Sequence, residues 1–320
     1  MSRGAVDAIE AARTAAPDPK SIGAESMDLR TSDGWSLRAD IYAPPRALGE
    51  PVGAIVLAHA MMARRSEFDR PKGAGLARFF AGRGYRVVAF DFRGHGDSEP
   101  APARGGSYSY DDLVLRDMPT ACAFARTRVR KGRPVFVLGH SLGGHVAFAA
   151  QGSGAIAVDG IVGVGAAVWL RRLEPSLRQW CFKRAVAAAI LRITRAVGRF
   201  PARALRIGSD DEARRYIEDI AQFVRRGRWC SADGSLDFWA SLARIRIPVL
   251  QVVSDGDTLE CASVCGVRFV EACGGPHDVI QIGRSDDGGP APSHMGIVTG
   301  GRVPHVWDRV ETWIRGIAAR

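Results

Sequence analysis

A serine near the middle of the chain stands in a sequence context that can do nucleophilic chemistry. Ser141 is the centre of the pentapeptide Gly-His-Ser-Leu-Gly at residues 139–143. The apolar residues 135–138 precede it, and a run of mostly small residues, 144–150, follows. A strand that turns sharply into a helix presents a serine hydroxyl in this way, and the turn tolerates no bulk on either side. The pattern predicts that Ser141 is a nucleophile.

A nucleophilic serine of this kind needs an acidic partner that comes later in the chain. The acid is expected just after the apolar strand at residues 248–253, where two aspartates, Asp255 and Asp257, compete. We favour Asp257, because it lies past the turn in the loop and is free to face the serine. Asp255 stays as the alternative, and both residues could also serve only to shape the turn.

The general base should be a histidine that follows the last strand. The position of His277, before that strand, puts it at the wrong end of the sheet, and His305 begins the terminal helix. His294 falls in the Gly/Pro-rich loop after the strand. We therefore predict that His294 takes the proton from Ser141 and returns it to the leaving group, while Asp257 fixes its tautomer.

An oxyanion that develops during acyl transfer needs two backbone N–H donors. One donor is expected from Leu142, the residue after the nucleophile. The second is expected from the loop after the strand at residues 54–58, with Met61 as the first candidate and Ala60 as the alternative. His59, at the start of this loop, is expected to brace it rather than to do chemistry.

The remaining histidines have structural interpretations. Residues 91–98 read Asp-Phe-Arg-Gly-His-Gly-Asp-Ser, which predicts a tight turn at a strand end, with His95 and Asp97 as internal hydrogen-bonding residues. His140 and His145 are expected to be packing residues. No cluster has the spacing of zinc ligands, and no Gly-rich phosphate loop precedes a lysine. We expect neither a metal nor a cofactor.

Apolar segments that alternate with helical segments must position these groups. Such alternation predicts an α/β fold, a parallel sheet covered by helices on both faces. The helices are expected to include residues 73–83, 111–126 and 305–318. About eight strands are expected, with an antiparallel pair at the N-terminal edge: residues 27–30, 35–42, 54–59, 86–92, 135–138, 160–164, 247–253 and 278–282.

The alternation of apolar strands and helices fails between Ala167 and Leu236, and this suggests how the chain is divided into domains. Residues 26–167 and 237–320 are expected to form the catalytic core, and residues 168–236 a helical cap. Residues 1–25 are expected to be a mobile leader without the apolar segment of a signal peptide. The cap aromatics Trp169, Trp180 and Phe182 are expected either to form the cap's core or to line an apolar acyl pocket.

Composition and charge limit the functional classes. The chain has 320 residues and a formal charge of +10, with 44 basic residues of which four are lysine. Residues 171–206 hold ten basic residues and one acid, Glu174. This cluster is interpreted as a solvated face or as a surface that attracts an anionic membrane or an acidic substrate. No nucleic acid is expected as a partner, and the sequence gives no indication of oligomeric state.

The cysteines and the hydropathy suggest where the protein works. Six cysteines include no Cys-x-x-Cys pair, so we expect buried free thiols and a cytoplasmic location. Cys261, Cys265 and Cys273 are expected to share one helix. No apolar run approaches the roughly 20 residues that span a membrane.

Four sequence blocks together resemble the α/β-hydrolase superfamily, over about residues 27–316. The blocks are residues 59–61, residues 91–98, residues 139–144, and Asp257 with His294. Residues 294–296, Trp307 with Trp313, and residues 198–201 are similar to a bacterial subgroup of predicted hydrolases related to serine-aminopeptidase-like and monoacylglycerol-lipase-like proteins. The resemblance implies an α/β-hydrolase fold and the same roles for Ser141, Asp257 and His294.

The sequence departs from this superfamily at two positions. The usual His-Gly of the oxyanion loop is His59-Ala60, and alanine does not readily adopt a positive φ, so the loop is expected to run differently. The His-Ala pair also resembles homoserine-acetyltransferase-like relatives. Ser254 stands before the acid loop, where glycine is more usual.

These features predict a serine hydrolase that cleaves a carboxylic ester of a small acyl or lipid-like substrate. Ser141 would form an acyl-enzyme, and water would release the acyl group. One alternative is an acyltransferase that uses the same residues with an alcohol or thiol acceptor. A second is a binding protein that keeps the scaffold without catalysis, because fold alone does not determine function.

Overall fold

A single twisted sheet organises the computed structural model, which describes residues 19–319. Its eight strands have the order β1-β2-β4-β3-β5-β6-β9-β10. The first two strands pair antiparallel and β2 pairs antiparallel with β4, whereas all later neighbours are parallel. The strands are β1 Ala24–Arg30, β2 Ser36–Tyr42, β3 Gly53–Ala58, β4 Tyr85–Phe90, β5 Val135–His140, β6 Gly160–Val164, β9 Val249–Ser254 and β10 His277–Ile282. The predicted eight-stranded, mostly parallel sheet is confirmed.

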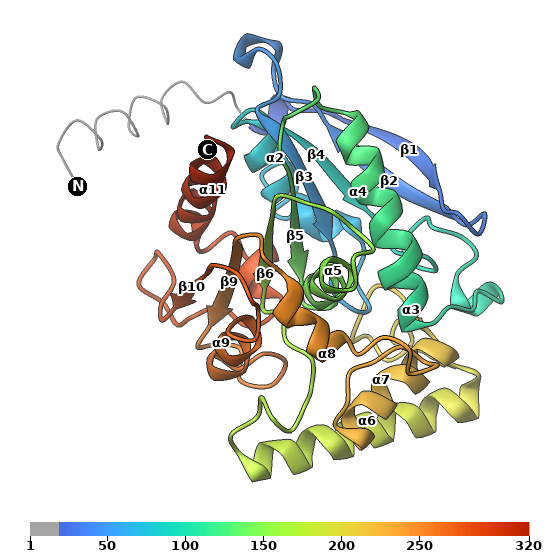
Figure 1. Ribbon diagram of the computed structural model, residues 1–320. Helices are drawn as coiled ribbons and strands as arrows, with labels where there is room; N and C mark the ends of the chain where they lie inside the picture. Colours follow the sequence, from blue (N-terminus) through green and yellow to red (C-terminus); the bar gives the residue numbers. More distant parts are fainter. Residues whose placement is uncertain (1–18, 320) are drawn as a thin grey trace.

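Helices cover both faces of the sheet (Figure 1). Two hydrophobic clusters flank it, because the central strands are buried on both sides and consist almost wholly of apolar residues. One cluster joins the sheet to α2 and α11, and the other joins it to α4, α5 and α9. The α-helices of the core are α2 Leu76–Ala81, α3 Tyr110–Asp112, α4 Met118–Thr127, α5 Leu142–Ser153, α8 Phe238–Ser241, α9 Ser263–Val270, α10 Gly296–Thr299 and α11 Pro304–Ala318.

Short 3-10 and π-helical turns complete the core. They are η1 Pro19–Ser21, η2 Arg46–Leu48, η3 Arg65–Asp69, η4 Pro102–Arg104, η5 Leu113–Asp117 and η6 Leu242–Arg244. The π-helical turn η5 joins α3 to α4, so the helix expected over residues 111–126 exists but is interrupted.

A few element boundaries differ from those expected. Strand β1 begins at Ala24, inside the predicted leader, because residues 24–30 pair with all of β2. Residues 19–21 of the predicted leader form η1, and residues 1–18 lie outside the described residues. Helix α2 is shorter than expected, and His277 belongs to β10 as its first residue.

The prediction that three cysteines share a helix is wrong. Only Cys265 lies on α9, whereas Cys261 precedes that helix and Cys273 follows it. All six cysteines are free. Burial was predicted correctly for four of them, but Cys230 is half-buried and Cys181 is exposed.

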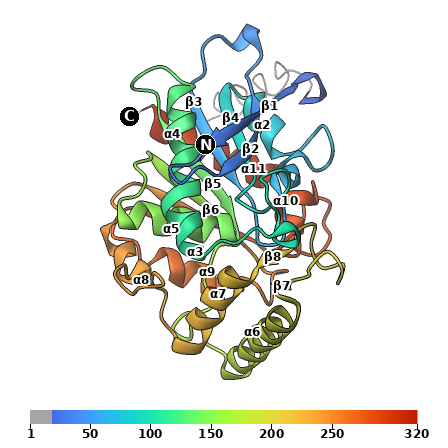
Figure 2. The same cartoon turned by 90° about the vertical axis from the view of Figure 1, so that its right-hand side faces the viewer.

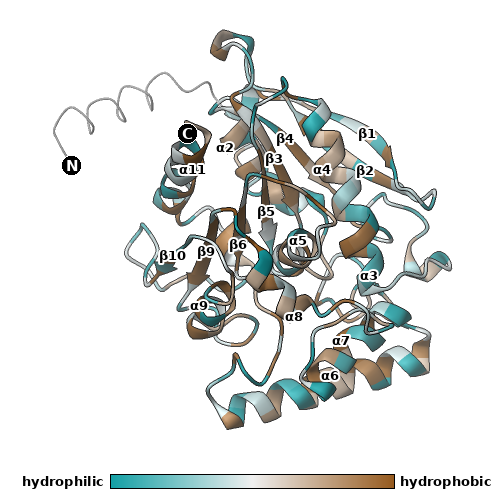
Figure 3. Ribbon diagram, viewed as in Figure 1, coloured by the Kyte–Doolittle hydropathy of each residue, from teal (hydrophilic) through white to brown (hydrophobic). Residues whose placement is uncertain are grey.

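The segment between β6 and β9 forms a separate layer beyond the carboxyl ends of the strands (Figure 2). It contains α6 Leu177–Val197 and α7 Arg214–Arg226, which pack on each other, and the small antiparallel pair β7 Arg199–Phe200 and β8 Glu212–Ala213. Along α6 polar and apolar residues are mixed, while the central strands are mostly apolar (Figure 3). These helices occupy the region that the sequence assigns to a cap, residues 168–236; the domain boundaries themselves stay a prediction.

The described helices were also compared with the requirements of a bilayer. Within residues 19–319, no helix combines the length and the apolar content that crossing a membrane demands.

Candidate active site

Ser141 sits in a strained turn between β5 and α5. Its backbone angles are φ 51° and ψ −112°, a conformation that residues with a side chain seldom adopt. A Cβ atom on Gly143 would lie 2.1 Å from the Ala58 carbonyl oxygen, and one on Gly139 would lie 2.3 Å from the Gly144 nitrogen. Both positions therefore require glycine because the backbone segments approach each other closely, as the sequence pattern predicted.

His294 and Asp257 meet at the carboxyl edge of the sheet. The Nδ1 atom of His294 makes a short hydrogen bond with Oδ2 of Asp257, and the other carboxylate oxygen accepts the Cys261 N–H at 3.0 Å. Burial favours the neutral acid, but the hydrogen bond and charge of His294 outweigh it and hold the pKa of Asp257 below its usual value. An ionised Asp257 is suited to hold an imidazole in one tautomer.

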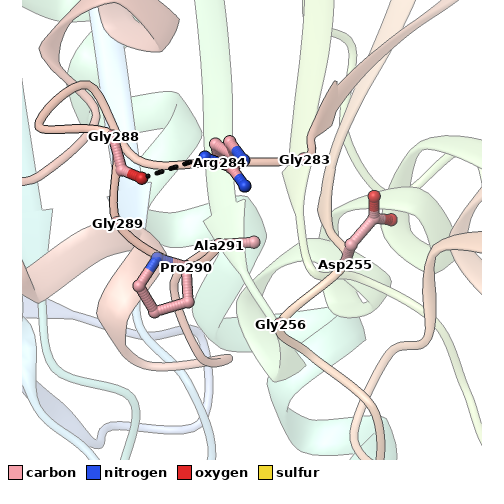
Figure 4. Close-up of a pocket in the computed structure, with 8 residues that line it drawn as sticks. All are labelled: Asp255, Gly256, Gly283, Arg284, Gly288, Gly289, Pro290 and Ala291. Carbon is pink, nitrogen blue, oxygen red and sulfur yellow. Dashed lines mark hydrogen bonds between the residues drawn. The ribbon is translucent and has the colours of Figure 1, made fainter.

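Asp255, the alternative acid, faces elsewhere. Its Oδ1 atom accepts hydrogen bonds from the Ser263 hydroxyl and from Gln281 Nε2, both at 2.7 Å. Figure 4 shows its side chain beside a separate hollow that is also lined by Arg284 and Pro290. Asp255 therefore anchors the strand end and does not contact His294.

Ser141 and His294 line the same cavity, together with Leu142. Among residues 19–319, no hydrogen bond joins the Ser141 hydroxyl to the imidazole of His294. Catalytic hydrogen bonds are often long without substrate and shorten in the complex.

Two backbone amides beside Ser141 are free to donate. The Ala60 N–H donates to Glu67 Oε1 at 3.1 Å, and the Met62 N–H donates to Glu212 Oε1 at 2.6 Å. The N–H groups of Met61 and Leu142 have no acceptor within the described chain, and both residues line the cavity. Of the two candidates for the second donor, Met61 is therefore the one whose N–H is not already used.

The oxyanion loop takes its shape from Met62 rather than from Ala60. Met62 has φ 58°, so it carries the positive backbone angle that the usual glycine would otherwise adopt. Its carbonyl accepts from the N–H groups of Ser209 at 2.8 Å and Asp210 at 3.2 Å, while its own N–H donates to Glu212. Segment 208–213 of the insertion thus holds both sides of this one residue.

Glu212 is fully buried and is shared by three donors. Besides Met62, it accepts from the Tyr108 hydroxyl at 2.7 Å and contacts His95 Nε2 at 3.1 Å. Burial alone would lower the pKa of His95, but the charge of Glu212 and its hydrogen bond raise it to about 9. His95 is therefore protonated at neutral pH and forms a buried ion pair between the core and the insertion.

The internal role predicted for His95 agrees with this geometry, but that of Asp97 does not. The Asp97 side chain is 63% exposed and pairs with Arg65, which also binds the buried Asp91. His59 does brace its loop, because Nδ1 contacts the Ala60 carbonyl at 2.7 Å and Nε2 accepts the Phe92 N–H at 3.0 Å.

His140 does more than the predicted packing. Its Nδ1 atom lies 3.1 Å from Glu67 Oε1, and its Nε2 atom lies 3.2 Å from the carbonyl oxygen of His294. Since Glu67 also binds the Ala60 N–H, His140 connects the oxyanion loop to the loop that carries His294. Sequence analysis missed Glu67 and Glu212, because their partners are distant along the chain.

A cavity of about 310 Å³ opens beside Ser141, between the sheet edge and the insertion. Its wall is mostly apolar and comes largely from α6 and α7, including Val186, Ile190, Ile217, Ile220 and Val224. Trp169 lines the cavity, which was one of the two alternatives predicted for the cap aromatics. Trp180 and Phe182 do not: Trp180 packs with Ala187 and Val224 inside the insertion, and Phe182 is 55% exposed.

One group of side chains has the composition of a metal site. Atoms of Asp257, Glu260 and His294 lie within 4.8 Å of one another. The Asp257 and His294 atoms are hydrogen-bonded to each other, and Glu260 is exposed, so a cation would have to displace that hydrogen bond.

The chain is similar to known proteins in both sequence and fold. The family described as "Serine aminopeptidase, S33" matches residues 49–278. Lysophosphatidylserine lipase ABHD12 from Gallus gallus is 35% identical over 102 residues, which are 32% of this chain and 24% of that protein. The Bos taurus protein of the same name is 41% identical over 73 residues, 22% of this chain and 16% of that one. The chain thus spans no more than a quarter of these relatives.

Solved structures share the fold over nearly the whole chain. A soluble variant of monoglyceride lipase from Saccharomyces cerevisiae, in complex with a substrate analogue, has a TM-score of 0.64 at 18% identity and covers 94% of this chain and 99% of its own. The α/β hydrolase GrgF from Penicillium sp. sh18 has a TM-score of 0.62 at 15% identity, with coverage of 93% and 99%. At such identities the likeness concerns the fold.

Proposed function

Because the chain belongs to the serine aminopeptidase S33 family and is a serine hydrolase of the α/β type, we propose that it hydrolyses carboxylic esters whose acyl chain occupies the cavity beside Ser141. The apolar wall supplied by α6 and α7 favours an aliphatic or lipid-like chain. The names of the similar proteins, a lysophosphatidylserine lipase and a monoglyceride lipase, point to the same substrate class.

The proposed reaction has two acyl-transfer steps. The Ser141 hydroxyl attacks the ester carbonyl while His294 takes its proton, and the N–H groups of Met61 and Leu142 stabilise the oxyanion. His294 then gives the proton to the departing alcohol, which leaves an acyl-enzyme. In the second step His294 activates water, the acyl-serine bond breaks, and the acid is released. Asp257 holds the tautomer of His294 throughout.

The observation that carries this proposal is the pair of unused amides at Met61 and Leu142, which line the cavity beside Ser141. Most backbone N–H groups in folded proteins have an acceptor, so two free donors at one serine suit a developing negative charge.

A serine-directed fluorophosphonate tests the nucleophile. The wild-type protein should be labelled, and Ser141→Ala should not. Ser153→Ala, at the far end of the same helix, is the matched control and should be labelled like the wild type. Labelling of Ser141→Ala at the wild-type rate would reject Ser141 as the nucleophile.

Product analysis distinguishes hydrolysis from acyl transfer. With p-nitrophenyl butyrate and a competing alcohol, a hydrolase should release mainly butyrate. A product that is mainly the new ester would make the protein an acyltransferase. Failure of every ester and of the phosphonate would favour a binding protein on the same scaffold.

The basic surface of the insertion supports a further part of this proposal, attraction to an anionic lipid surface. Exposed arginines on α6 and in the following loop alternate with exposed apolar side chains, among them Leu177, Phe182, Val197 and Ile207. Basic residues attract anionic lipid and apolar ones enter the interface. Turnover on anionic micelles should then fall steeply with added salt, whereas turnover of a soluble ester should not.

A further inference from the structure

The wall of the cavity contains a tyrosine hydroxyl that has no hydrogen-bond partner in the described part of the chain. Tyr216, on α7, lines the cavity and is 1% exposed. Its ring packs against Tyr108 with centroids 5.8 Å apart, yet its hydroxyl makes no hydrogen bond with any of residues 19–319. A buried hydroxyl without a hydrogen bond is costly, so one that faces a binding cavity suits a polar atom of the ligand.

A second polar group that lines the same cavity is the imidazole of His145. His145 lies on α5 four residues beyond Ser141, which is about one helical turn or roughly 6 Å along the axis. Burial lowers its pKa to about 3, so the ring is neutral at physiological pH. One of its nitrogens is therefore a donor and the other an acceptor.

The neighbour of His145 determines which nitrogen carries the proton. Nδ1 lies 2.9 Å from the fully buried hydroxyl of Tyr110, whose other polar neighbour, the indole N–H of Trp229, can only donate. The Tyr110 proton therefore goes to Nδ1, because an unpaired buried donor would otherwise remain. The ring proton of His145 is then on Nε2, which has no acceptor among residues 19–319. His145 and Tyr216 both offer a donor to the cavity.

We propose that Tyr216 and His145 form a polar subsite that binds an oxygen acceptor of the substrate, a carbonyl or hydroxyl oxygen about one helical turn from the scissile ester. This inference rests on the proposed ester hydrolysis and adds the substrate class: an oxygenated chain rather than a plain aliphatic one. The surrounding wall is mostly apolar, so each donor is worth more here, once the substrate has displaced water, than at an exposed site.

The subsite should discriminate against chains that lack the oxygen. A plain alkyl chain would cover the two donors without pairing them, and an unpaired buried donor costs more than a missing contact. We therefore expect wild-type kcat/KM to favour the oxygenated ester by about 3- to 30-fold, the range that one or two neutral hydrogen bonds supply.

Matched esters test this expectation. The p-nitrophenyl esters of 4-oxopentanoate, 5-oxohexanoate and 6-oxoheptanoate are compared with those of pentanoate, hexanoate and heptanoate. A parallel series places the ketone in the alcohol, as the butyrate ester of 5-hydroxypentan-2-one against pentyl butyrate. One oxygenated ester in either series should exceed its plain partner.

The variant Tyr216→Phe removes the hydroxyl and keeps the ring that packs on Tyr108. It should lower kcat/KM for the preferred keto ester and raise kcat/KM for its plain partner, because the alkyl chain no longer covers an unpaired donor. His145→Phe should act in the same direction. Tyr42→Phe, a buried tyrosine on β2 in the hydrophobic cluster of the opposite sheet face, is the matched control and should leave the ratio unchanged.

The subsite is overturned if no oxygenated ester is preferred, or if Tyr216→Phe keeps the wild-type ratio. Calorimetry with Ser141→Ala gives an answer that does not need turnover: the preferred keto ester should bind 3-fold or more tighter than its plain partner, and the added Tyr216→Phe change should abolish the difference. If the Ser141→Ala protein shows this preference while the wild type hydrolyses no ester, the subsite stands and the proposed hydrolysis fails.

Discussion

Asp255 and Asp257 lie two positions apart in one loop, yet their carboxylates have different partners. Asp257 binds His294, whereas Asp255 binds Ser263 and Gln281 at the strand end. The loop can separate them because Gly256 packs against the next loop, where a Cβ would lie 2.3 Å from the Ala291 carbonyl. One carboxylate therefore faces the imidazole, and the other anchors the strand end.

The two aspartates form a matched pair for mutagenesis. Asp257→Asn should lower kcat by roughly 10²–10⁴-fold, because the amide no longer stabilises the protonated form or the correct tautomer of His294. Asp255→Asn should keep kcat within a few-fold of the wild type. Steady-state kinetics on a p-nitrophenyl ester measures both, and the reverse order of effects would make Asp255 the catalytic acid.

Removing Glu212 should impair both stability and the chemical step. Glu212→Ala leaves the Met62 N–H, the Tyr108 hydroxyl and protonated His95 without a partner, which should cost about 3–5 kcal/mol of unfolding free energy. The neighbouring Met61 N–H would lose its position, so kcat should fall by roughly 10–10²-fold with a smaller change in KM.

The matched control for this prediction is Glu218→Ala, which removes a partly exposed ion pair with Arg214 on α7. It should change stability by less than about 1 kcal/mol and leave kcat unaltered. Denaturant titration and kinetics decide the matter together. If Glu212→Ala lowers the unfolding free energy but keeps the wild-type kcat, Glu212 has a structural role alone.

The His95–Glu212 pair should make stability depend on pH in the alkaline range. The pKa of His95 is raised to about 9 in the folded protein from an ordinary 6.5. A raised pKa means that folding binds the proton more tightly, so the contribution is complete below about pH 6.5 and is lost as the pH rises through 9.

Thermal melts between pH 6 and 10 measure this contribution. The Tm of the wild type should decline across the range, and the decline should be much smaller in Glu212→Gln, which keeps an oxygen acceptor for Met62 but not the charge that holds the proton. If the Tm of both proteins declined with pH in parallel, His95 would be excluded as the titrating group.

Two glycines should respond to alanine in opposite ways. Gly143→Ala places a Cβ 2.1 Å from the Ala58 carbonyl and should displace the turn that carries Ser141, with loss of activity and of at least about 2 kcal/mol of stability. Gly316→Ala, on the open side of α11, meets no atom within 4 Å and should stabilise by about 0.5–1 kcal/mol. Equal effects of the two changes would mean that the close approach at Gly143 is unimportant.

The sheet could be predicted from sequence because its central strands are buried on both faces. Residues of β3, β5 and β9 are apolar nearly throughout, and such runs stand out from their surroundings. The positions of Ser141 and Asp257 could be predicted for a related reason, since each follows one of these strands and must lie at the same edge of the sheet.

The wall of the cavity could not be predicted in the same way. Which side of α6 faces the core depends on its packing against α7, and this contact turns Val186 and Ile190 to the cavity but leaves Phe182 outside. Glu212 and Glu67 were missed because a single acidic residue in a sequence does not disclose that its partners lie far along the chain. Likewise, Ala60 indicated that the loop differs from the usual His-Gly loop of the superfamily, but it did not indicate that Met62 adopts the positive φ.

Segment 208–213 is hydrogen-bonded to both the N–H and the carbonyl of Met62, and this limits which segments of the insertion can be replaced in this protein. A substrate-specificity module grafted from a relative in place of α6 and α7 would arrive without the acceptor and donors that Met62 requires. Successful chimaeras should therefore place their junctions outside residues 208–213, on either side of the segment, so that the recipient keeps Ser209, Asp210 and Glu212 while α6 and α7 are exchanged.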